Sequence, residues 1–188
     1  TVGMVLEDVE IRIADLEIED EVKKNGDIGV VEVKGPNVFK GYWKQPEKTK
    51  SEFRDDGYFI TGDMGFLDQD KYLTIVGRNK DLIITGGLNV YPKEIETVID
   101  QDSKVDESAV VGVSHPDFGE GILAIIVEKK GHSINVDILN ETLRKNLAAF
   151  KLPKKIHVIK ELPRNSMGKV QKNVLRDIYR DEFSDTNK

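Results

Sequence analysis

The sequence predicts an α+β fold, with a β-rich, barrel-like part first and a smaller α+β part after it. Residues 1–77 hold alternating or short apolar runs, bounded by Gly, Asp and Pro. From about residue 80, helical spacings of three and four residues appear between runs typical of buried strands. We therefore expect two domains, residues 1–79 and 80–188, with a hinge at about residue 80.

In the first part, Val9, Ile11 and Ile13 alternate with polar residues, as in a half-buried strand. The run GDIGVVEVKGP (26–36) predicts a second strand, because Gly and Pro bound its apolar centre. Residues 57–78 contain three short apolar runs separated by Gly and Asp turns, a pattern that fits a small antiparallel barrel or meander. Between these regions, YWKQPEKTKSEFRDDG (42–57) predicts a loop or short helix, and we expect Trp43 and Phe53 to anchor it.

In the second part, Pro92 is placed to open a helix at its first position. The runs SAVVGV (108–113) and GILAIIVEK (121–129) predict buried strands. Asn135 predicts the N-cap of a helix with an apolar stripe over residues 139–150. KIHVIK (155–160) predicts another strand, and a final helix follows it. The stripe consists of Leu139, Leu143, Leu147 and Phe150.

Composition excludes several classes of protein and site. There is no cysteine in the 188 residues, which rules out disulfides, Cys-ligated zinc and a thiol nucleophile. No apolar run approaches the roughly 18 residues that a membrane-spanning helix needs. We expect a cytoplasmic protein without a membrane span. The three histidines are dispersed, so no metal site is predicted.

The net charge of −6 does not favour a general nucleic-acid-binding protein. However, residues 143–180 hold eleven Lys or Arg and two Asp or Glu, which gives 11 − 2 = +9 for that window. The remainder of the chain therefore carries −6 − 9 = −15. The basic window is either a solvated face or a surface that meets phosphates.

Asp63 follows the apolar run Tyr58-Phe59-Ile60, and we expect Gly62 and Asp63 to end that strand with an exposed carboxylate. The two oxygens of a carboxylate can accept hydrogen bonds from both hydroxyls of a ribose. An ordinary turn aspartate is the alternative.

The segment GRNKDLIITGG (77–87) offers a second group of candidates. The guanidinium of Arg78 suits ribose oxygens and phosphates. Lys80 lies where the two parts meet and could absorb the backbone change of a domain rotation. Gly86 and Gly87 allow either a tight turn or close approach of a ligand to the backbone. A hairpin with solvated basic side chains is the alternative.

Lys169 lies in ELPRNSMGKVQK (161–172), a polar stretch that Pro163 and Gly168 mark as a mobile loop. Its ammonium could reach into a site and stabilise developing negative charge. A solvated side chain is the alternative. We interpret His115 and Asp117 as part of a loop between strands rather than a catalytic dyad, and the sequence lacks a G-x-S-x-G elbow.

The ordered set YFITGD, GRNKDLIITGGLNVYPKEIE and LPRNSMGK resembles the C-terminal third of the adenylate-forming acyl-CoA synthetase superfamily, over essentially the whole chain. GPNVFKGYWKQPEKT, SHPDFGEG and LPRNSMGKVQKNVL look most like malonyl-CoA synthetases, and less like medium- or long-chain fatty acyl-CoA ligases. The resemblance implies two half-reactions. A carboxylate first attacks the α-phosphate of ATP, and the thiol of coenzyme A then displaces AMP from the acyl-adenylate.

By this resemblance, Asp63 and Arg78 bind the ATP ribose, and Lys169 bridges the carboxylate and α-phosphate oxygens during adenylation. Gly86 and Gly87 match the stretch that lines the pantetheine tunnel. Lys80 takes the hinge position, where many relatives have Asp. A rotation about Lys80 would bring Lys169 into the site for adenylation and withdraw it for thioester formation.

The family's glycine-rich phosphate loop, its magnesium-holding residues and its acyl pocket are absent from the sequence. The chain also starts within strand-like sequence without Met. We therefore expect a fragment that is inactive without an N-terminal domain of the same polypeptide. ATP, Mg²⁺ and coenzyme A are its expected cofactors and substrates, none held tightly by the fragment. A fatty acyl-CoA ligase, a ligase that charges a carrier protein and a non-catalytic interaction module are the alternatives.

Overall fold

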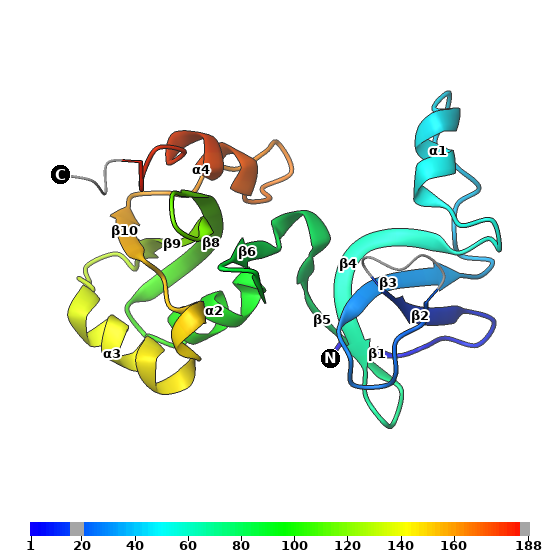
Figure 1. Cartoon of the computed structure of the whole chain (residues 1–188), viewed down its shortest axis with the longest axis horizontal. Helices are drawn as coiled ribbons and strands as arrows, with labels where there is room; N and C mark the ends of the chain where they lie inside the picture. Colours follow the sequence, from blue (N-terminus) through cyan, green and yellow to red (C-terminus); the bar gives the residue numbers. More distant parts are fainter. Residues whose placement is uncertain (16–20, 185–188) are drawn as a thin grey trace. The chain divides into compact units, whose positions relative to one another are not determined.

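The computed structural model describes residues 1–15 and 21–184 of the chain (Figure 1). Its backbone contacts divide the chain into two units, Thr1–Lys80 and Asp81–Lys188. This division falls beside the boundary that the sequence predicts. That the two units act as separate domains about a hinge stays a prediction.

Unit 1 is built on one curved, antiparallel sheet of five strands in the order β1-β5-β4-β3-β2 (Figure 1). Its small apolar core consists of Ile13, Val31 and Leu73, which lie on three different strands. The β-rich character predicted for the first part is confirmed. The strands are β1 Gly3–Met4, β2 Glu10–Ala14, β3 Gly29–Lys34, β4 Phe59–Leu67 and β5 Tyr72–Arg78.

The strand β4 corrects one expectation. Gly62 and Asp63 do not end the strand, because β4 runs on to Leu67 and Asp63 lies in its middle. Gly62 takes a positive φ of 72°, which glycine tolerates, and the pairing with β5 shifts register between Met64 and Gly65. These irregularities allow β4 to continue through Gly62 and Asp63, which the sequence alone suggests as a turn.

A short helix, α1 (Pro46–Glu52), stands beside an aromatic cluster. The ring centroid of Phe39 lies 5.0–5.5 Å from those of Tyr42, Phe53 and Phe59, in edge-to-face geometry. Phe53 is therefore an anchor, as expected. Trp43 is not, because 85% of it is exposed.

Unit 2 has a five-stranded mixed sheet in the order β10-β9-β6-β7, with β8 also paired to β9. β10 runs parallel to β9, and the other pairs are antiparallel. The strands are β6 Ile83–Thr85, β7 Leu88–Val90, β8 Val105–His115, β9 Gly119–Glu128 and β10 Lys155–Ile159. The helices are η1 Asn79–Asp81, which spans the unit boundary, α2 Pro92–Ile99, α3 Val136–Asn146, η2 Ala149–Lys151 and α4 Lys172–Ile178.

The strand β9 is apolar on both faces because helices cover both sides of the sheet. Ile122, Ala124 and Ile126 pack into the core shared with α2 and α3. The alternate residues of β9 pack into a second core that includes Leu175 of α4. A continuous apolar run rather than an alternating one is what a doubly covered strand requires. The α+β character predicted for the second part is confirmed.

The starts of the helices follow the sequence signals. Pro92 is the first residue of α2, and the Asn135 side chain accepts from the backbone N–H groups of residues 137 and 138 at the start of α3. The end of α3 differs from the expectation, because the helix stops at Asn146. Leu147 is still buried, but Phe150 is 40% exposed in η2. Within the described residues, no helix is long and apolar enough to cross a membrane.

Candidate functional site

Asp63 and Arg78 meet in unit 1, where they are cross-strand partners on β4 and β5. Arg78 Nε lies 2.8 Å from Asp63 Oδ1, and Arg78 Nη1 donates to the Thr61 carbonyl at 3.3 Å. The backbone around the carboxylate is also held, because Asp63 N donates to Thr61 Oγ1, which itself donates to the Val31 carbonyl. The sheet therefore fixes the direction in which the carboxylate points.

This pair can bind a polyhydroxylated or anionic ligand. The carboxylate side chain is 29% exposed and that of Arg78 is 52% exposed, so both are accessible in unit 1. No described residue donates to the second carboxylate oxygen, Oδ2. That oxygen and the free edge of the guanidinium match the donor and acceptor pattern of ribose hydroxyls and a phosphate.

Lys80 lies exposed in the single turn η1, as the last residue of unit 1. The next residue is held firmly in unit 2, because Asp81 Oδ1 accepts from Arg176 Nη2 of α4 at 2.6 Å. The framework of unit 2 thus begins immediately after Lys80. This placement agrees with the hinge role suggested for Lys80 but does not test it.

Gly86 and Gly87 form the two-residue tip of the hairpin between β6 and β7. Both have positive φ, 56° and 77°, as a tight type I′ turn requires. Gly86 N donates to the Phe118 carbonyl, and nothing lies within 4 Å of a side chain built on Gly87. The turn explains both glycines locally, and the exposed backbone of Gly87 also leaves room for a ligand.

Lys169 lies in a turn that is held by hydrogen bonds, rather than in the loose loop expected from the sequence. Asn165 Oδ1 accepts from the N–H groups of Met167 and Lys169, and Asn165 N donates to the Lys169 carbonyl at 3.0 Å. Gly168 takes a φ of 77°, which closes the turn. The backbone of Lys169 is fixed on both sides.

The ammonium of Lys169 is not held by a partner in the way that its backbone is. The residue is exposed, and no carboxylate among the described residues forms an ion pair with its Nζ. An unpaired ammonium on a fixed backbone is available to a negatively charged ligand. Asp63 and Arg78 belong to unit 1 and Lys169 to unit 2, so each group of candidate residues is described within its own unit.

Much of the basic window 143–180 forms structural ion pairs that the sequence did not reveal. Five of its cations pair with carboxylates elsewhere in unit 2, and Lys154 Nζ lies 4.1 Å from the centre of the Phe118 ring. Five of the eleven cations thus take part in ion pairs, and the two interpretations of the window as a solvated face or a phosphate-binding surface stay predictions. The five pairs are Lys151–Glu94, Lys155–Glu182, Arg164–Glu107, Lys172–Glu96 and Arg176–Asp81.

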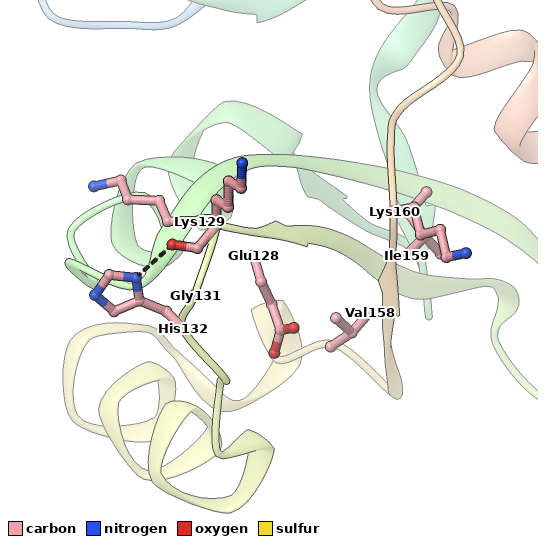
Figure 2. A pocket seen from close by; sticks show the side chains of 8 residues that line it. Glu128, Lys129, Gly131, His132, Val158, Ile159 and Lys160 are labelled. Atoms are coloured by element: carbon pink, nitrogen blue, oxygen red, sulfur yellow. Dashed lines mark hydrogen bonds between the residues drawn. The ribbon is translucent and has the colours of Figure 1, made fainter.

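A basic hollow of about 420 Å³ lies in unit 2 beside the ends of β9 and β10 (Figure 2). Glu128 Oε1 accepts a hydrogen bond from Ile134 N at 2.7 Å, and His132 Nδ1 contacts the Lys130 carbonyl. In Figure 2, Lys129 and Lys160 stand on opposite sides of Glu128 and do not converge. The hollow lacks the geometry of a binding site. Among residues 1–15 and 21–184, no cluster of three potential metal ligands occurs.

His115 ends β8, and its Nδ1 accepts from Asp117 N. The ring is buried between Phe118 and Phe183. Asp117 meets His115 only through its backbone, so the interpretation as a connection between strands is confirmed.

Comparison with known proteins identifies this fold. Residues 94–169 match the family described as the AMP-binding enzyme C-terminal domain, and the matched segment ends on Lys169. The chain therefore contains an AMP-binding enzyme C-terminal domain. The strands β8 and β9 and the helix α3 lie within that match, and α2 begins two residues before it.

Among solved structures, ATP-bound MatB from Rhodopseudomonas palustris is 57% identical, with a TM-score of 0.90 over 96% of this chain and 36% of that chain. A long-chain-fatty-acid–CoA ligase of Haemophilus influenzae is 41% identical, over 94% of this chain and 31% of the relative. A 2-succinylbenzoate–CoA ligase of Geobacillus sp. (strain WCH70) is 39% identical, over 87% of this chain and 33% of the relative. The chain thus spans about a third of the length of these relatives.

Proposed function

We propose that the chain works as part of an ATP-dependent, AMP-forming acyl-CoA ligase, and that malonate is its acid substrate. The observation that carries the ligase proposal is Lys169, an unpaired ammonium on a fixed turn at the end of the matched family segment. The malonate proposal is supported by the 57% identity to the malonyl-CoA synthetase MatB, against 41% to the long-chain fatty acid ligase.

In this proposal, the two units supply different parts of the reaction. Asp63 accepts hydrogen bonds from the ribose hydroxyls of ATP, and Arg78 keeps that carboxylate oriented. Lys169 offsets the charge between the substrate carboxylate and the α-phosphate during adenylation. The exposed Gly86-Gly87 backbone then borders the pantetheine arm of coenzyme A.

The same ammonium would obstruct the thiol in the second half-reaction. We therefore propose that unit 2 turns about Lys80 between the half-reactions. The remaining parts of the site, including the acyl pocket and the Mg²⁺ ligands, are assigned to an N-terminal domain of the same polypeptide. The described residues offer no magnesium cluster of their own. A cytoplasmic location is proposed from the cysteine-free composition.

Replacing Lys169 with Ala tests the role of the ammonium. The variant is made in a ligase that carries this chain as its C-terminal part, either the native polypeptide or a chimera with the N-terminal part of MatB. Pyrophosphate-forming adenylation should fall on the order of 10²–10³-fold, because a preorganised charge is removed from the transition state. Thioester formation from supplied acyl-adenylate should persist. Equal loss of both half-reactions would refute the assigned role.

A panel of acids tests the substrate in the native polypeptide. Malonate should support coenzyme A-dependent AMP formation with a higher kcat/KM than a long-chain fatty acid or 2-succinylbenzoate. Preference for a fatty acid would replace malonate with the alternative that the 41% identical relative suggests. No adenylation with any acid would favour the non-catalytic interaction module.

A further inference from the structure

A guanidinium links the turn that carries Lys169 to the sheet of unit 2 through polar contacts. Arg164 Nη1 donates to the Gly168 carbonyl at 2.6 Å, and Arg164 Nη2 forms an ion pair with Glu107 of β8. The Gly168 carbonyl belongs to the peptide bond that leads into Lys169. One side chain therefore links that peptide directly to a strand 57 residues away in the sequence.

The other contacts of the turn are local. Arg164 and Val170 form an isolated antiparallel bridge, and Gln171 N donates to the Pro163 carbonyl. Asn165 caps the inside of the turn through its side chain. These bonds shape the turn but all lie within residues 163–171. Among the described residues, Val170 adds apolar packing against the core on β8 and β9, and the Arg164–Glu107 pair supplies a charged, directional link from this set to the β8–β9 sheet.

The Glu107 end of the link is well supported. Glu107 lies in β8, which pairs with β9 over nearly its whole length, and its side chain is 26% exposed. Arg164 can serve two acceptors at once because its planar fork presents several N–H groups in fixed directions. A lysine has no such fork. The chemistry of the residue therefore matches its two simultaneous contacts.

We propose that Arg164, held by Glu107, is a positioning residue for Lys169: it fixes the Gly168–Lys169 peptide so that the ammonium approaches the reacting oxygens from one direction. This inference rests on the proposed ligase function. It assigns no contact with substrate to Arg164 itself. A displacement of about 1 Å in a reacting group can cost on the order of 100-fold in rate, so a support of this kind affects catalysis.

The first test measures the turn without any activity. In the 188-residue chain, amide hydrogen exchange of Lys169 reports its bond to Asn165 Oδ1. Arg164→Ala should speed that exchange roughly two- to tenfold, the worth of one hydrogen bond, with amides of β9 unchanged. Arg144→Ala, an exposed arginine of α3 without an ion pair among the described residues, is the matched control. Unchanged exchange at Lys169 would overturn the proposal.

The second test uses the ligase described above and four variants: Arg164→Ala, Arg164→Lys, Lys169→Ala and the double Ala variant. Arg164→Ala should lower kcat of adenylation on the order of 10–100-fold with little change in the KM for ATP. Thioester formation from supplied acyl-adenylate should be retained. Arg164→Lys should be intermediate, because it keeps the charge opposite Glu107 but loses the fork.

The double variant separates the two proposals. If Arg164 acts through Lys169, the double variant should be no slower than Lys169→Ala alone. Additive losses, or a loss shared equally by both half-reactions, would overturn the positioning role while leaving Lys169 in place. If Lys169→Ala itself leaves adenylation intact, the proposed function of Lys169 fails instead.

Discussion

The two units hold their candidate charged groups in opposite ways. In unit 1, Asp63 is paired with Arg78 across two strands, and both side chains have a fixed partner. In unit 2, the Lys169 backbone is fixed, but no carboxylate of the described chain pairs with its ammonium. The pairing fixes the direction of the carboxylate. The unpaired ammonium is available to a negatively charged ligand.

The difference extends to the surroundings of each group. Around Lys169, other cations of unit 2 are occupied by carboxylates, including Arg164 by Glu107 and Lys172 by Glu96. Lys169 has no such partner among the described residues, unlike Arg164 and Lys172 close to it in the sequence. Sequence composition shows only a basic window, whereas the structure separates the cations that form ion pairs from those that do not.

Breaking the buried ion pair between Glu96 and Lys172 in unit 2 should have the largest effect on stability. Glu96 is 6% exposed, and its Oε1 accepts from Lys172 Nζ at 2.5 Å and from Val110 N at 2.9 Å. Glu96→Ala should cost about 3 kcal/mol in the free energy of unfolding, because a half-buried ammonium and a buried N–H both lose their acceptor. Urea denaturation of the chain measures this cost.

Two further variants sharpen that measurement. Glu96→Gln keeps an acceptor for Val110 N and should cost less than the Ala variant. Glu94→Ala removes the more exposed pair with Lys151 and should cost about 0–1 kcal/mol. Equal costs for Glu94→Ala and Glu96→Ala would show that the buried pair is not a special support.

Breaking the pair in unit 1 should affect binding more than stability. Asp63→Asn keeps the size of the side chain but removes its charge and one acceptor. In the ligase, KM for ATP should rise roughly tenfold, the worth of one charge-assisted hydrogen bond. Asp70→Asn, at an exposed turn of the same unit, is the control. An unchanged KM for ATP would remove Asp63 from the nucleotide site.

The features that the sequence predicts well are those with local causes. Pro92 starts α2 and Asn135 caps α3 because each effect depends on a few neighbouring backbone groups. The Gly86-Gly87 hairpin follows equally from local geometry. By contrast, the continuation of β4 past Asp63 depends on pairing with β3 and β5, which no local pattern records.

The ion pairs around Lys169 are harder to predict from the sequence. LPRNSMGK points to Lys169, and its Asn165 is a recognisable turn residue. However, Arg164 meets Glu107 at a separation of 57 residues, and Lys172 meets Glu96 at a separation of 76. Charged residues are common enough that a sequence offers many such pairings. Only the sheet order and the position of α4 select these two.

A small, pH-dependent effect concerns an ion pair at the edge of unit 2. Glu182 is 12% exposed, pairs with Lys155 and lies 3.1 Å from His157 Nε2. Burial alone would raise the pKa of Glu182, but Lys155 and His157 favour its charged form and hold the pKa below the ordinary value of 4.5. A lowered pKa stabilises the fold above the unfolded-state pKa, and that contribution disappears as the pH falls through the folded-state pKa.

Glu182→Gln should therefore lower the free energy of unfolding by about 1 kcal/mol at pH 7, and the difference from the parent chain should vanish well below pH 4.5. Urea denaturation at both pH values measures this difference, with Glu161→Gln as an exposed control on the same unit. The effect should leave the Lys169 amide exchange unchanged, because Glu182 has no contact with the turn at residues 163–171. A pH-independent difference would mean that packing of Glu182, and not its charge, supports this edge of the unit.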